Sequence, residues 1–107
     1  MLDRSSSADL PPAVAHHLTT LAAQVWIAET TGAGRERWPD YFADPHLRAP
    51  YRDVRIQAAI ARRARGQESR AVVRLVWEGT NSSGETKDSR TGMLSFEDHR
   101  NEWQPVR

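Results

Sequence analysis

The feature that most constrains the fold is an alternation of apolar and polar residues that begins after Ser69 and runs to Val106. In an extended chain, residues 71–78 place Ala71, Val73, Leu75 and Trp77 on one face and Val72, Arg74, Val76 and Glu78 on the other. A two-residue period in β-branched and aromatic residues predicts a β-strand. The second face is half apolar, so we expect it to be partly covered.

Two further strands follow in the same pattern. Residues 79–84 are rich in Gly, Ser and Asn, which predicts a turn, and alternation resumes from Thr86 to Phe96. After a polar turn, residues 102–106 form a short strand anchored by Trp103. Pro105 lacks an N–H donor, so this strand should end there or lie at a sheet edge. Short turns between strands make an antiparallel meander.

The N-terminal part predicts one long helix that packs on this sheet. Between residues 11 and 31 a helical stripe consists of Val14, Leu18, Leu21, Ala22 and Val25. Asp9 is the predicted N-cap, two prolines follow in the first turn, and Gly32 ends the helix. Residues 1–10 are expected to be a flexible tail. The aromatic-rich run 35–42, interrupted by Pro39, predicts one or two short helical turns that plug one end of the core.

Residues 51–65 fit two structures. As a helix, they have Asp53 as a cap, Gly66 as a stop and many Ala, Arg and Gln residues. As a strand, they place Val54, Ile56, Ala58 and Ile60 on one face. We favour the strand, because the alternation continues through residue 60 and residues 65–68 resemble a hairpin turn. The fold class is therefore α+β, with an N-terminal helix packed on a curved antiparallel meander of three to four strands.

Composition limits the classes of function. A chain of 107 residues forms one domain, here residues 11–107, and the lack of cysteine excludes disulfides, thiol nucleophiles and cysteine-bound metals. The net charge of +1 gives no indication that the chain binds polyanions such as nucleic acids. No apolar run approaches the roughly 20 residues of a membrane span. We expect a cytoplasmic protein if Met1 is the native start, and an extracytoplasmic one if the chain is a trimmed domain.

The order of elements resembles a known superfamily. Residues 73–78, the run Leu94–Glu97 and the strand of Trp103 are similar to the terminal strands of the nuclear transport factor 2-like (cystatin-like) superfamily. The likeness covers residues 14–106 and implies a cone-shaped α+β domain. The chain lacks the strand and helix that catalytic members insert before the meander. Its shorter layout is more similar to the periplasmic scaffold domains of conjugation and type IV secretion machines, which act by protein–protein contact.

Catalytic and metal signatures are weak. The four histidines have no metal-site spacing and are interpreted as surface residues: His16, His17, His46 and His99. In the superfamily's isomerases and cyclases, an acid works with a tyrosine or histidine in the cavity. The resemblance therefore makes Asp40, Tyr41 and His46 the candidate catalytic residues at a cavity mouth. No cofactor is predicted.

Arginines provide the strongest charge feature. Seven of them fall between residues 51 and 78, where only three acidic residues occur. The candidate binding residues are Arg52, Arg55, Arg62, Arg63, Arg65 and Arg74. The interpretations, in falling order of preference, are a solvated sheet face, a surface for an acidic protein partner, and an anion or nucleic-acid site. Exposed aromatics, which a nucleic-acid site favours, are missing from this stretch.

The sequence favours a non-catalytic interaction domain over an enzyme. Its leading hypothesis is a homodimer that pairs through the sheet face of Val72, Val76 and Met93, as in a scaffold of a secretion or conjugation assembly. The first alternative is an isomerase- or cyclase-type enzyme that binds a small molecule. The second is arginine-mediated binding of an anion or a nucleic acid.

Overall fold

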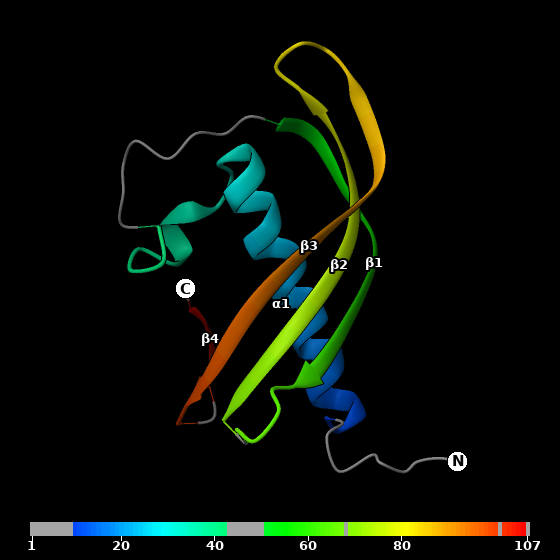
Figure 1. The fold of residues 1–107 in the computed structure, drawn as a ribbon. Helices are drawn as coiled ribbons and strands as arrows, with labels where there is room; N and C mark the ends of the chain where they lie inside the picture. The colour runs from blue at the N-terminus through cyan, green and yellow to red at the C-terminus, as the bar shows by residue number, and fades with distance from the viewer. Residues whose placement is uncertain (1–9, 43–50, 68, 101, 107) are drawn as a thin grey trace, which may run out of the picture.

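The computed structural model describes residues 10–42, 51–67, 69–100 and 102–106. Helix α1 (Pro12–Thr31) is followed by a 3-10 turn η2 (Arg35–Arg37) and four strands: β1 (Tyr51–Arg63), β2 (Arg70–Asn81), β3 (Thr86–His99) and β4 (Glu102–Val106). The strands form one antiparallel sheet in the order β1-β2-β3-β4, which is open at both edges. Figure 1 shows α1 along one face of this curved sheet. The predicted α+β class and meander are confirmed.

Helix α1 ends at the predicted glycine, but its N-cap is not the predicted one. Pro11 occupies the N-cap, so the helix starts on the two prolines, and Asp9, the predicted cap, lies outside the described residues. Gly32 has a φ of 87°, a left-handed conformation that suits glycine, and its N–H donates to the carbonyl of Ala28. The Arg35 side chain donates to the carbonyls of Ala28 and Glu29. A cation at this end also offsets the negative pole of the helix dipole.

The strand prediction for residues 51–65 is confirmed, but its predicted facing is wrong beyond Ile56. Ile56 pairs with Trp77 and Ala58 pairs with Val76, so Gln57 is an extra residue in β1. One extra residue moves every later side chain to the opposite face. Ala59 and Ala61 therefore pack against the core, while Ala58 and Ile60 face solvent. Two further shifts, at residues 53–54 of β1 and opposite Glu78 in β3, add to the curvature of the sheet.

The core lies between α1 and the inner face of the sheet. Strand β2 contributes the predicted alternate residues Ala71, Val73, Leu75 and Trp77, all buried. From the helix, the buried apolar residues are Leu18, Ala22, Val25 and Ala28. The rings of Trp38 and Phe42 meet edge to face, with their centroids 6.5 Å apart, and both belong to this hydrophobic core. The prediction that the aromatic turn plugs the core is confirmed.

Strand β4 is the second edge of the sheet, as Pro105 predicted. It pairs with β3 only, from Ser95↔Val106 to His99↔Glu102. No helix among the described residues is both long and apolar enough to span a membrane.

Candidate functional site

The sheet face that points away from α1, here called the outer face, is organised in rows of cross-strand neighbours. The first row is Arg62, Val72, Ser95 and Val106; the second is Ile60, Arg74 and Met93; the third is Ala58, Val76 and Thr91. Residues that pair across strands share one face, so these side chains form one surface. No helix of the described chain covers it (Figure 1).

Two large apolar side chains stand out on the outer face. Ile60 is 57% exposed and Met93 is 58% exposed, and they are the exposed large hydrophobics among the described residues. Both are register neighbours of Arg74, so they flank its side chain on the two adjacent strands. Val72 and Val76, half-buried, continue the apolar surface along β2. An apolar patch with a polar rim is typical of a surface that binds another macromolecule.

Arg74 separates two shallow hollows in this face. One, of about 340 Å³, is lined by Ile60, Arg62, Val72 and Arg74. The other, of about 370 Å³, is lined by Arg74, Thr91, Gly92 and Met93. Each hollow combines apolar walls with a guanidinium group, which suits side chains that carry both methylene and polar groups.

The structure brings the three predicted interface residues together and separates the predicted arginines. Val72, Val76 and Met93 all lie on the outer face. Of the six candidate binding arginines, Arg62 and Arg74 lie there too. Arg55, which pairs with Glu78, lies farther along the same face, beyond the bulge. Arg52 is opposite Thr80 at the far end of β1, and Arg65 is in the β1–β2 turn. Arg63 alternates to the inner side. The arginines therefore form no single cluster.

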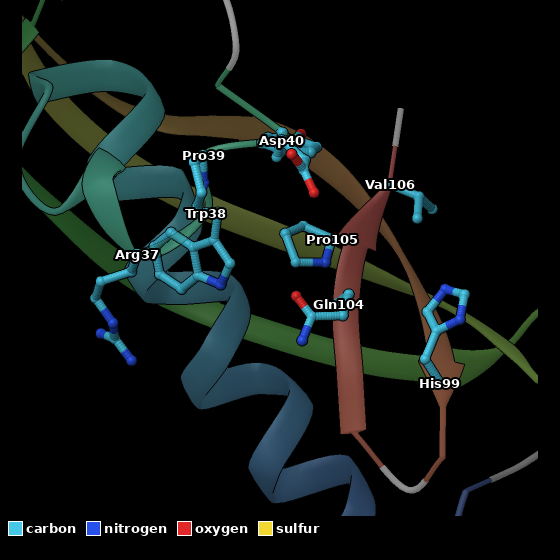
Figure 2. Close-up of a pocket in the computed structure, with 9 residues that line it drawn as sticks. Arg37, Trp38, Pro39, Asp40, His99, Gln104, Pro105 and Val106 are labelled. Atoms are coloured by element: carbon cyan, nitrogen blue, oxygen red, sulfur yellow. The ribbon is translucent and has the colours of Figure 1, made fainter.

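The candidate catalytic residues lie at a different place. Asp40 and Tyr41 line a pocket of about 420 Å³ between the turn after η2 and strand β4, together with Trp38, His99 and Gln104. Figure 2 shows Asp40 above Pro105 and His99 on the far side of β4. His46 lies outside the described residues.

Two of the polar groups at this pocket are held by carboxylates of the protein itself. The Tyr41 hydroxyl lies 3.4 Å from Oε1 of Glu29, to which it donates. Nε2 of His99 is 2.8 Å from Oε1 of Glu97, whose other oxygen is 3.3 Å from Nε of Arg70. These contacts tie Tyr41 to the helix and His99 to its own strand. Neither contact brings Tyr41 and His99 together as an acid–base pair.

Between the helix and the sheet, aromatic rings pack against one another. Trp77 meets Trp26 at 5.5 Å and Tyr51 at 5.0 Å between ring centroids, both edge to face. The Arg90 guanidinium lies 5.2 Å from the centroids of Tyr51 and Trp77, and its Nη1 donates to the Tyr51 hydroxyl at 2.7 Å. Within the described ranges, no group of three or more His, Asp or Glu residues forms a metal site.

Sequence reasoning missed Ile60 on the outer face, because uninterrupted alternation placed it on the same face as Ile56. A scan against protein-family models, a search of curated proteins and a search of solved structures each returned no match.

Proposed function

We propose that this protein is a non-catalytic interaction domain that pairs with a second copy of itself through the outer face of the sheet. The observation that carries the proposal is the row Ile60–Arg74–Met93, in which two largely exposed apolar side chains flank one arginine. Burying these side chains against a partner removes apolar surface from water, which is the main driving force for association.

The charges along β2 make the outer face complementary to itself. Arg74, Val76 and Glu78 are alternate residues of one strand and therefore lie on the same face. A two-fold axis that lies in the interface beside Val76, perpendicular to β2, would bring Arg74 of each copy to Glu78 of the other. The Glu78 carboxylate already accepts a hydrogen bond from Nε2 of Gln57 at 3.1 Å, which holds it in place. Such isologous contacts are the usual basis of homodimers.

The size of the face sets the expected strength of the pair. Three strands of about 12 residues, at about 3.3 Å per residue and about 4.8 Å between strands, present roughly 600 Å². Two copies would then bury about 1,200 Å², the lower end for specific interfaces. We therefore expect a dissociation constant in the micromolar range, roughly 1–100 μM.

The test is sedimentation equilibrium of the wild-type protein and two variants. Met93→Glu would place a charge within the contact, one row from Val76, and we expect it to abolish pairing. Ser82→Glu adds the same charge at an exposed residue of the β2–β3 turn and is expected to pair as the wild type does. A wild-type chain that stays monomeric at about 100 μM would contradict the proposal.

We also propose that the chain is a short member of the nuclear transport factor 2-like superfamily. The support is the order of a long helix, an aromatic turn and a curved four-stranded meander. A relative with an experimentally determined structure, found by a deeper sequence search and superimposing on all four strands, would test this assignment.

Small-molecule binding at the pocket of Asp40 and Tyr41 is a second candidate. Its volume, about 420 Å³, lies within the range of roughly 300–1,000 Å³ that ligand pockets occupy. A fragment screen followed by amide chemical shifts tests it. Shifts confined to residues 37–41 and 104–106 support a ligand site there, and a screen without hits at that pocket argues against it.

A further inference from the structure

The two edges of the sheet differ in how well they are protected from pairing with another strand. Strand β4 has five residues and contains Pro105, and the turn around Asp40 lies beside it. Strand β1 has 13 residues and no proline. Its first half carries two register shifts, and Asp53 has a φ of 52°. From Ala58 to Arg63, however, β1 pairs with β2 residue for residue.

The hydrogen bonds fix which backbone groups of this segment point outward. The N–H of Ala64 donates to the carbonyl of Arg70 at 2.8 Å, so Ala64 faces β2. In an antiparallel pair, hydrogen-bonded and non-hydrogen-bonded residues alternate. Counting back from Ala64, the N–H and C=O groups of Arg63, Ala61 and Ala59 point away from β2. They point toward the edge of β1 with which no other strand of the described residues pairs, here called the free edge.

Little in the side chains shields this edge. Ala59 and Ala61 are small and pack inward, and residues 58–61 contain no charge, proline or register shift; the charges of the segment, Arg62 and Arg63, lie at its end. Natural edge strands are normally blunted by at least one of these devices. A regular edge with small side chains is therefore suited to receive an added strand.

Charge decides which strand would fit. Residues 51–67 contain five arginines and one acidic residue, Asp53. A second copy would bring two equally basic edges together, whereas an acidic segment would be attracted. Beside the edge lies the hollow formed by Ile60, Arg62, Val72 and Arg74. Its apolar walls suit the methylene groups of a glutamate, and the Arg74 guanidinium group suits the carboxylate.

We propose that the free edge of β1 from Ala58 to Arg63 binds an extended acidic segment of another protein as a fifth strand of the sheet. The inference goes beyond self-association through the outer face, because it uses the backbone edge of β1. The segment would carry acidic residues at alternate positions, since these side chains face the same side of the sheet as Ile60 and Arg62.

The experiment uses fluorescein-labelled nine-residue peptides and fluorescence anisotropy. The first peptide alternates glutamate with valine or threonine. The second has lysine in place of glutamate, and the third has the composition of the first with its glutamates in one block. We expect the alternating acidic peptide to bind at least tenfold more tightly than the other two. Equal binding of the three, or no binding of the first up to about 1 mM, would overturn the proposal.

Backbone pairing is tested by N-methylation of the alternating acidic peptide, which leaves the protein unchanged. Methylation of one alternate set of amides removes the donors that face β1, and methylation of the other set removes those that face away. We expect one set to weaken binding at least tenfold and the other to have little effect. Equal effects of the two sets would overturn strand addition, because binding by charge alone does not distinguish them.

Two further measurements separate this proposal from self-association. Peptide binding is repeated in a Met93→Ser background, which removes apolar surface from the outer face without adding a charge beside Arg74. Binding should persist there even though outer-face pairing is weakened. Ala61→Pro removes an outward-pointing N–H donor of β1. In sedimentation equilibrium this variant should dimerise as strongly as the wild type. A large loss of dimer in Ala61→Pro, with no peptide binding by the wild type, would assign the edge to a second copy and overturn the proposal.

Discussion

Gly92 of β3 lies directly against the indole ring of Trp26 in α1: a Cβ atom at residue 92 would stand 2.7 Å from Cη2 and Cζ2 of that ring. Gly92 shares the inner face of β3 with Leu94 and Phe96, both buried. The absence of a side chain at residue 92 lets the largest ring of the helix rest on the strand. Here glycine serves close packing between layers.

Gly92→Ala should therefore destabilise the fold by about 1–3 kcal/mol, the usual effect of overpacking a core. Urea unfolding measures this loss. In the Trp26→Phe background the benzo-ring atoms that meet the added Cβ are gone, so the same change should have a much smaller effect. An equal loss in both backgrounds would contradict the contact between the two residues.

The bulge at Gln57 gives opposite outcomes for two adjacent alanines. Ala58→Glu places a carboxylate in solvent and should change the free energy of unfolding by no more than about 0.5 kcal/mol. Ala59→Glu places it against Leu75 and should be destabilising by about 2 kcal/mol or more. Chemical denaturation of the two variants compares them directly. If Ala58→Glu were the more destabilising change, Ala58 and not Ala59 would face the core, as the uninterrupted alternation in the sequence predicted.

Trp77 and Ile60 test the division between core and outer face. Trp77 is 4% exposed, and its replacement by alanine should reduce the free energy of unfolding by about 3–5 kcal/mol. Ile60→Ala should cost less than about 1 kcal/mol, because that side chain is mostly in solvent. Urea midpoints of the two variants check the ranking. A small loss for Trp77→Ala would mean that its ring is exposed at an interface.

A charge swap tests the proposed two-fold axis beside Val76. Arg74→Glu and Glu78→Arg should each weaken dimerisation, on the order of tenfold, because each creates two like-charged contacts per dimer. The double variant reverses both charges and should recover most of the wild-type affinity. Sedimentation equilibrium of all four proteins gives the comparison. Additive losses in the double variant would exclude this pairing of Arg74 with Glu78.

Much of the fold follows from local pattern. The alternation in residues 71–78 defines β2, and the stripe around Leu18 defines α1, because one-sided burial imposes a period on the sequence. The facing of β1 beyond Ile56 does not follow, since the extra residue at Gln57 leaves no signal in a run of small and apolar residues. Only pairing with β2 determines where the strand shifts.

The candidate surface could be predicted only in part for the same reason. Val72, Val76 and Met93 share a face because their strands alternate regularly, so their grouping was predictable. Ile60 was placed on the same face as Ile56, since its true facing depends on the bulge three residues earlier. The spread of the arginines depends on strand facing and turns, which composition does not reveal. His99 contacts Glu97 two residues away on the same strand face, a contact that spacing alone does not identify.

The measurement that tests the central claim most directly is sedimentation equilibrium of the wild-type chain between about 1 and 300 μM, beside Met93→Glu. Pairing through the outer face predicts an average mass that rises from 12.1 kDa toward twice that value in the wild type. The Met93→Glu chain should stay at the monomer mass. A wild-type mass of 12.1 kDa at every concentration, or dimers of equal strength in the variant, would contradict it.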